Sequence, residues 1–151
     1  MRRSGASAIL LGGSIGGALD LAFALVFAAV NGTGPEQLLQ AIASGLLGAA
    51  AYEGGLPAAA LGAGAHFAMS FAWAALFVAA AARVPRLAQQ PWVWGPAFGV
   101  LVFLAMRLVV LPLSAFPHPV RLVTLSAGLD LLSHMFLFGL PIAWAARARR
   151  E

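Results

Sequence analysis

The chain has 151 residues, of which 62% are hydrophobic and only 9% are charged. A soluble domain carries about 25% charged residues, so this composition excludes an ordinary soluble protein and indicates an integral membrane protein. The net charge is +4, but every basic residue is an arginine and the arginines lie at the ends of apolar segments, a pattern that argues against nucleic-acid binding. There are no cysteines, which excludes disulfides and thiolate chemistry.

Four apolar stretches are each long enough to form a transmembrane helix, which needs about 20 residues to cross the hydrocarbon core of a bilayer. They cover residues 8–30, 56–82, 94–116 and 122–146, with approximate ends. We therefore predict an all-α, polytopic membrane protein, a four-transmembrane-helix bundle in contact with the lipid bilayer. Residues 1–151 are expected to form a single transmembrane domain.

The arginines alternate between the two sides of the predicted spans. Two precede the first span, none lies in the 31–55 connection, two follow the second span, one lies in the third connection and three close the chain. The positive-inside rule then places the N- and C-termini in the cytoplasm. The wealth of Ala, Gly and Arg is typical of a GC-rich bacterial genome, so we expect the bacterial inner (cytoplasmic) membrane. A cleaved signal peptide is the rival interpretation of the first span, but Asp20 interrupts its apolar run.

A short amphipathic helix is predicted over about residues 34–50, between the first two spans. The motif "TGPE" at 33–36 fits a capping box with Thr33 as the N-cap. One helix face carries the apolar side chains of Leu38, Leu39, Ile42, Leu46 and Leu47, and the other carries Gln37, Gln40 and Ser44. The segment is too short to span, so we expect it to lie on the outer interface or to re-enter part-way.

Ionisable side chains inside a membrane are costly and therefore informative. The spans contain five of them: Asp20, His66, Arg107, Asp130 and His134. A helix rises about 1.5 Å per residue, which puts all five between the midplane and the outer third of the bilayer. Each shares a helix face with a small residue four or eight positions away, and small residues mark faces where helices pack closely. We predict that the five form one intramembrane polar cluster.

Within this cluster Arg107 is expected to pair with Asp20 or Asp130, because an unpaired arginine at that depth is costly. The remaining carboxylate would hold a histidine in one tautomer, and Asp130 and His134 are well spaced for that role. Glu53 in "AYEGGLP" is a possible residue of the outer mouth of the cluster, although a solvated turn carboxylate is the simpler interpretation. No metal site is predicted.

Three interpretations of the cluster stay open. It is structural or accessory, with hydrogen bonds worth about 0.6 kcal/mol each that fix which helices meet. Alternatively it is the proton relay of a proton-linked transporter or permeation pathway, and four helices barely enclose a path, which favours a homodimer. In the third interpretation His66 and His134 are axial ligands of a b-type haem, although we expect no cofactor.

No catalytic residue and no enzymatic activity are predicted. Ser70 or Ser133 close to a histidine is a weak signal of a catalytic nucleophile. The substrate of a transporter is not indicated by any motif.

The last two-thirds of the chain resembles the YagU-like family of small bacterial inner-membrane proteins. The resemblance lies in "GAHFAMSFAWAALF" in the second span, "MRLVVLPLSAFPHP" at the end of the third and "LSHMFLFGLPIAWAARARR" in the fourth. It implies the multi-span topology and a histidine in each of spans two and four, here His66 and His134. It implies little about activity, because the family is essentially uncharacterised.

Overall fold

The structure is a computed structural model that describes residues 4–147. Its first two long helices are α1 (Gly5–Val30) and α3 (Gly55–Arg83). The third consists of α5 (Pro91–Ala105), the π-helical η2 (Met106–Val110) and α6 (Leu111–Leu113), and the fourth of α7 (Leu125–Ser133), the π-helical η3 (His134–Gly139) and α8 (Leu140–Arg147). All four are long and apolar enough to cross a membrane, and the described residues contain no strand. The predicted all-α four-helix bundle is confirmed, and the chain is a multi-pass membrane protein.

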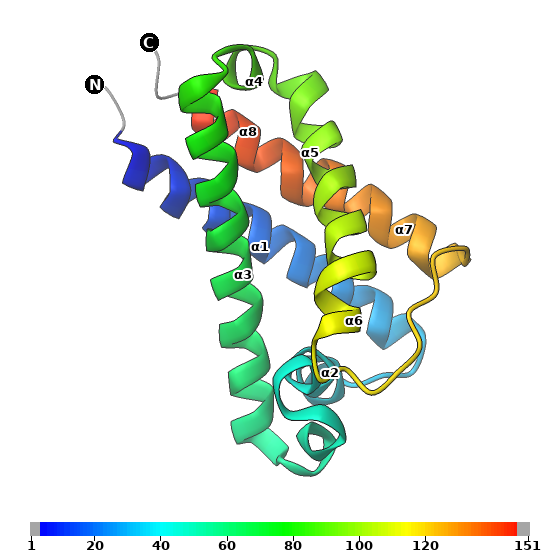
Figure 1. The fold of residues 1–151 in the computed structure, drawn as a ribbon. Helices are drawn as coiled ribbons and strands as arrows, with labels where there is room; N and C mark the ends of the chain where they lie inside the picture. Colours follow the sequence, from blue (N-terminus) through cyan, green and yellow to red (C-terminus); the bar gives the residue numbers. More distant parts are fainter. Residues whose placement is uncertain (1–3, 148–151) are drawn as a thin grey trace.

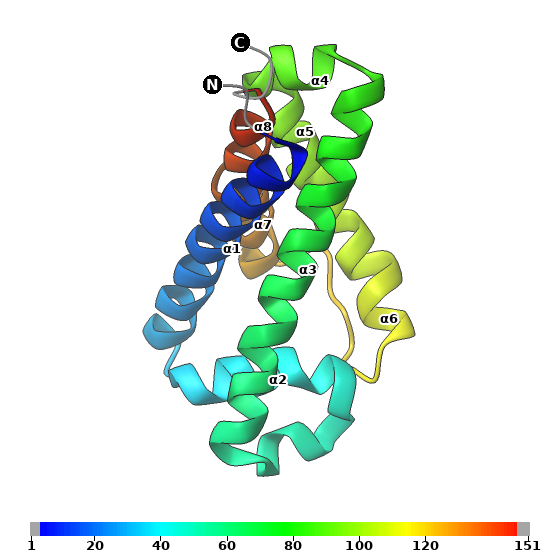
Figure 2. The same cartoon turned by 90° about the vertical axis from the view of Figure 1, so that its left-hand side faces the viewer.

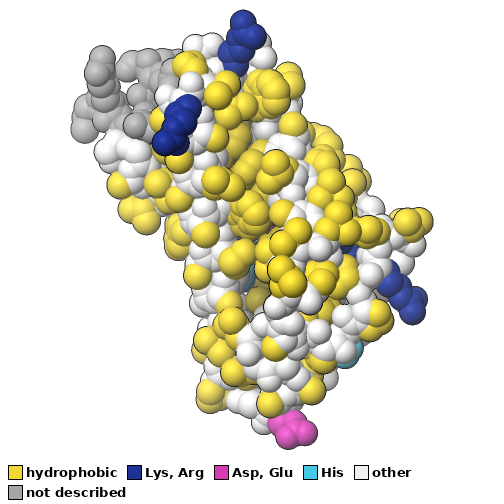
Figure 3. All heavy atoms as spheres, viewed as in Figure 1, with side chains coloured by type: hydrophobic (Ala, Val, Ile, Leu, Met, Phe, Trp, Pro, Cys, Tyr) yellow, Lys and Arg dark blue, Asp and Glu magenta, His cyan; other side chains and the backbone are white. Residues whose placement is uncertain are grey.

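The two ends of the bundle differ in what closes them (Figures 1 and 2). The short helix α4 (Arg86–Gln89) lies at one end, together with the start of α1 and the end of α8. At the opposite end lie α2 (Pro35–Leu47), the 3₁₀ segment η1 (Gly48–Glu53) and the loop 114–124. We call these the α4 end and the α2 end. Figure 3 shows arginine side chains at the α4 end and an acidic side chain at the tip of the α2 end.

The third helix begins and ends three residues earlier than predicted, and the fourth begins three residues later, because of the residues at their ends. Pro91 begins α5, because a proline in the first turn lacks only an N–H that would have no helical partner. The helix ends before Ser114, whose hydroxyl donates to the Leu111 carbonyl at 2.7 Å. At the start of α7, Thr124 Oγ1 accepts a hydrogen bond from the Ala127 N–H at 3.0 Å, so this helix begins at Leu125.

The apolar core occupies the half of the bundle toward the α4 end. Small residues of α1, α3 and α8 interlock there with a few large side chains, and Phe77 meets Phe98 edge-on with 4.9 Å between ring centroids. Val102 and Ile142 are almost completely buried in the same region. Because this half is filled by apolar atoms, the ionisable residues of the spans collect in the other half.

Helix α2 is present as predicted, but its cap and orientation differ from the expected ones. Thr33 is not the N-cap: Pro35 is the first helical residue, so Gly34 takes that position and caps without a side-chain bond. Gln40 and Ser44 of the predicted polar face are buried against the protein, whereas Gln37 is exposed and Leu46 of the apolar face is 62% exposed.

Glycine at position 62 explains this packing. A Cβ on Gly62 of α3 would overlap the Leu39 carbonyl, so the backbone of α2 lies directly on α3. Gln40 then donates to the Gly55 carbonyl at 3.3 Å and to Glu36 Oε1 at 3.1 Å. These bonds tie α2 to the beginning of α3 and close the α2 end of the bundle.

Candidate functional site

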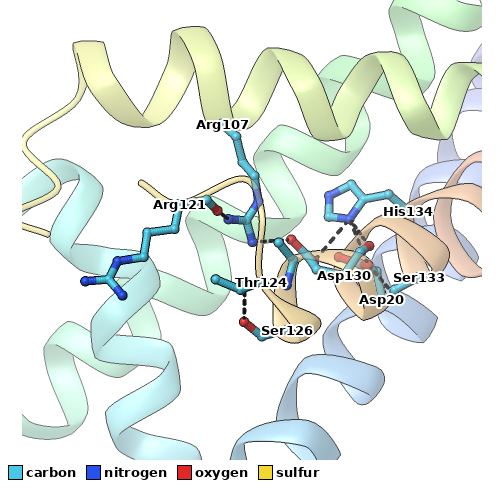
Figure 4. A network of polar contacts seen from close by, with 9 residues as sticks. Asp20, Arg107, Arg121, Thr124, Ser126, Asp130, Ser133 and His134 are labelled. Carbon is cyan, nitrogen blue, oxygen red and sulfur yellow. Dashed lines mark hydrogen bonds and ion pairs between the residues drawn. The ribbon is translucent and has the colours of Figure 1, made fainter. Parts of the chain in front are cut away.

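A network of polar side chains joins three of the four long helices (Figure 4). We call it the polar cluster, and its members are Asp20 on α1, Arg107 in η2, Asp130 and Ser133 on α7, and His134 at the start of η3. Four of the five residues predicted to meet are therefore brought together. Ser133 was missed as a member, since a serine inside an apolar helix carries no distinctive sequence signal.

The strongest contact of the cluster is the ion pair between Arg107 and Asp130. Arg107 Nη2 lies 2.9 Å from Asp130 Oδ2, and the two side chains are 20% and 35% exposed. Arg107 Nη1 donates to the backbone carbonyl of Arg121, and its guanidinium lies 4.9 Å from the centroid of the Phe103 ring. The predicted pairing of Arg107 with a carboxylate is confirmed, and the partner is Asp130.

His134 lies between the two carboxylates. Its Nδ1 is 2.9 Å from the Asp130 backbone carbonyl, 3.2 Å from Asp130 Oδ1 and 3.8 Å from Asp20 Oδ1. A carbonyl oxygen can only accept, so Nδ1 carries the hydrogen, and Nε2 of the neutral ring is free to take a proton. One carboxylate therefore serves both Arg107 and His134, because Asp130 is one helical turn before the histidine.

Asp20 is held by a neutral partner. The Ser133 hydroxyl donates to Asp20 Oδ1 at 2.6 Å, and both residues are buried. We expected one carboxylate to pair with Arg107 and the other to hold the histidine. Instead Asp130 does both, because its carboxylate lies 3.2 Å from His134 Nδ1, whereas that of Asp20 lies 3.8 Å away.

His66 lies outside the polar cluster, contrary to the prediction. Its Nε2 donates to the Gly17 carbonyl of α1 at 2.9 Å, and one turn further along α3 the Ser70 hydroxyl donates to the Gly13 carbonyl at 2.7 Å. Glycines expose their carbonyls and allow α3 to approach α1 closely. The His66 imidazole thus joins α3 to α1. It lies at a level along the bundle similar to that of the polar cluster, but it contacts a different side of α1.

Glu53 is exposed in η1 and makes none of the hydrogen bonds or ion pairs found in residues 4–147, so the structure does not place it at the mouth of the cluster.

An open pocket of about 460 Å³ lies next to the cluster, between η2, α6 and the loop 114–124. Arg107 lines it from within and His118 from the loop, where the imidazole Nε2 lies 3.0 Å from the Tyr52 hydroxyl. Arg107 therefore belongs both to the polar cluster and to this outer pocket.

Both π-helical segments carry a residue of the cluster. Arg107 lies in η2 and His134 begins η3. π-Helical turns are rare and occur frequently at functional sites, because the extra residue re-aims the neighbouring side chains. Gly99 of α5 faces η3, and a Cβ there would overlap the His134 carbonyl, so the backbones of the two helices meet at the cluster.

A cation site and a haem site fit this geometry poorly. Asp20, Asp130 and His134 offer ligand atoms within 4.8 Å of one another, but the guanidinium of Arg107 already contacts Asp130 and would repel a metal ion. His66 Nε2, which would have to ligate a haem iron, is bonded to a carbonyl. The glycines of α1 that would make room for a porphyrin face Phe71, Phe138 and Ile142.

Neither serine close to a histidine is arranged as a nucleophile. The Ser133 hydroxyl donates to Asp20 and the Ser70 hydroxyl to a carbonyl, so neither is bonded to an imidazole in residues 4–147.

A scan against protein-family models and searches of curated proteins and of solved structures find no match to this chain. The resemblance to the YagU-like family stays a prediction.

Proposed function

We propose that this chain is a proton-linked transporter or permeation pathway whose polar cluster binds and releases one proton. The observation that carries the proposal is the charge count of the cluster. The cluster holds two carboxylates and one guanidinium, which leaves one negative charge when both carboxylates are ionised and His134 is neutral. An uncompensated charge inside a membrane is costly, and one proton on the cluster cancels it.

The geometry supplies a place for this proton. Nδ1 of His134 donates toward Asp130, so Nε2 is the nitrogen that can accept. A protonated ring would carry its positive charge 3.2 Å and 3.8 Å from the two carboxylates. Histidine is the side chain whose unperturbed pKa lies closest to neutral pH, and proton exchange is its ordinary task.

Access from water is unequal at the two ends. Arg107 extends from the outer pocket to Asp130, so protons have a short route from the α2 end. Toward the α4 end the apolar core around Phe77 and Phe98 closes the way. Transport then requires a movement of the helices, for which the π segments η2 and η3 are natural positions, or a path completed by a second copy in a homodimer.

The proposed location is the bacterial inner membrane with the α4 end in the cytoplasm. Arg83, Arg86 and Arg147 lie toward the α4 end, and among residues 4–147 the α2 end carries the lone Arg121 of the loop. The positive-inside rule favours this orientation. The outer pocket would then open on the periplasmic side.

Proton flux in liposomes tests the proposal. The purified protein is reconstituted with a pH-sensitive dye inside, and a potassium diffusion potential drives protons inward. We expect flux in the wild type and its loss in Asp20→Asn, whose amide oxygen can still accept from Ser133. Glu53→Gln, a matched change at an exposed carboxylate, should conduct like the wild type.

A structural or accessory role makes a different prediction. Asp20→Asn and Asp130→Ala would then lower the thermal stability without changing the proton permeability of the liposomes. Wild-type protein that folds in liposomes and moves no protons would contradict the proposed function.

A further inference from the structure

The outer pocket adjoins the polar cluster at Arg107, and the proposed proton step does not use its apolar walls. We infer that it binds a small organic monoanion, a carboxylate with an apolar body, and that binding is coupled to the uptake of one proton by the polar cluster. This inference rests on the proposed function and names the class of its substrate.

The walls of the pocket have the chemistry that such a molecule needs. Leu108 and Leu111 line it from the third helix, and Phe116 and Val120 line it from the loop 114–124. A volume of about 460 Å³ lies in the usual range of small-molecule sites, roughly 300–1,000 Å³. The apolar body of an organic acid fits these walls, whereas an inorganic anion would leave them unfilled.

Arg107 supplies the recognition of the charge. A guanidinium has five N–H donors in a planar fork that matches a carboxylate. Two of them are engaged, with Asp130 and with the Arg121 carbonyl, and the buried Nε has no hydrogen-bond partner. Because Nε is buried, a carboxylate in the pocket would accept from the second N–H groups of Nη1 and Nη2, which the two engaged bonds leave open.

Coupling to a proton follows from the charges that face Arg107. In the cluster, the titratable groups around it are Asp20 from α1, Asp130 from α7 and His134 from η3. Across the pocket, His118 of the loop 114–124 lies 3.0 Å from the Tyr52 hydroxyl. Arg121 contacts the guanidinium through a carbonyl only, and His66 of α3 is bonded to the Gly17 carbonyl. With one proton bound the cluster is neutral. A bound carboxylate adds one negative charge and competes with Asp130 for the guanidinium. A second proton, taken from water onto the pair of Asp130 and His134, restores neutrality.

Calorimetry with benzoate measures this coupling directly. The full-length protein in detergent is titrated with sodium benzoate in two buffers that differ in ionisation enthalpy, which yields the number of protons taken up on binding. We expect about one proton for each benzoate, and by linkage an affinity that falls about tenfold for each unit of rising pH. Benzyl alcohol, the neutral analogue, should bind far more weakly.

Two tryptophan substitutions in one loop locate the site. Val120→Trp fills the pocket and should abolish benzoate binding. Val123→Trp, at a position that is 97% exposed and outside the pocket, should bind benzoate like the wild type.

Benzoate binding that survives Val120→Trp, or that takes up no proton, would overturn the inference. So would a short-chain phosphatidylglycerol that displaces benzoate at lower concentration, because the pocket would then be a lipid headgroup site. Proton flux of the wild type without benzoate reports on the proposed function separately.

Discussion

The Ser133 hydroxyl donates a 2.6 Å hydrogen bond to Asp20 Oδ1, between residues that are far apart in the sequence. This bond joins the first long helix to the fourth, and both of its residues are buried. It also holds the Asp20 carboxylate 3.8 Å from His134 Nδ1. The position of the second carboxylate in the polar cluster therefore depends on a neutral hydroxyl.

Replacing Ser133 with alanine removes that donor and leaves a buried carboxylate oxygen without its shortest bond. We expect the free energy of unfolding to fall by about 1–3 kcal/mol, the usual cost of an unsatisfied buried polar group. Chemical denaturation in detergent micelles measures it. Ser126→Ala is the matched control, because the exposed Ser126 hydroxyl is bonded only to Thr124, and its stability should stay within about 0.5 kcal/mol of the wild type. Equal stability of the two variants would show that the contact with Asp20 contributes nothing.

The ion pair of Arg107 and Asp130 predicts a compensating double mutant. Arg107→Gln leaves two carboxylates without a cation, and Asp130→Asn leaves a guanidinium unpaired. Each should lose about 1–3 kcal/mol, less than a fully buried pair because the side chains are 20% and 35% exposed. The double variant Arg107→Gln/Asp130→Asn should recover much of this loss, and a double-mutant cycle in detergent measures the coupling.

Arg121→Gln is the control for that cycle. Its side chain points away from the cluster in Figure 4, and its contact with Arg107 is through the backbone carbonyl. We expect stability near that of the wild type. Additive losses in the double variant would mean that Arg107 and Asp130 do not interact in the membrane.

Composition and run length were sufficient to predict the four long helices, and the amphipathic pattern of residues 34–50 predicted the short helix before the second span. The sequence also limited the acidic partner of Arg107 to two residues, because Asp20 and Asp130 are the only acidic residues inside the predicted spans. Which of the two it chooses depends on helix rotation. That rotation is set by the contact of Gly99 with the His134 carbonyl and by the π turns, which no sequence period reveals.

Depth along a helix was the signal that placed His66 in the cluster, and depth does not determine direction around the axis. His66 and Asp20 are close to the same level, yet His66 is directed to the Gly17 carbonyl. The sequence could not predict the orientation of α2 for a related reason. An apolar face can turn to lipid as well as to protein, and the buried Gly62 that draws the polar face inward is one of many glycines.

The orientation of α2 can be tested with single cysteines, since the chain has none of its own. A spin label on Leu46→Cys should be strongly relaxed by oxygen, which concentrates in the hydrocarbon, because Leu46 is 62% exposed on an apolar face. Cysteine at Ser44, which is completely buried against the protein, should react slowly with a maleimide in folded protein. Rapid labelling of Ser44→Cys with poor oxygen access at position 46 would reverse the orientation of the helix.

The contact between Gly99 and η3 predicts a large effect of a single methyl group. In Gly99→Ala the Cβ would overlap the His134 carbonyl and come within 2.5 Å of the Met135 Cα, so η3 has to move and His134 with it. We expect a loss of about 1–3 kcal/mol, as for other overpacked sites, together with impaired proton flux in liposomes. Gly128→Ala, on the exposed face of α7 with no atom within 4 Å of the new Cβ, should be stabilised by about 0.5–1 kcal/mol through helix propensity alone. The opposite signs make the pair decisive: if both variants gain stability, α5 does not approach His134 closely enough to position it.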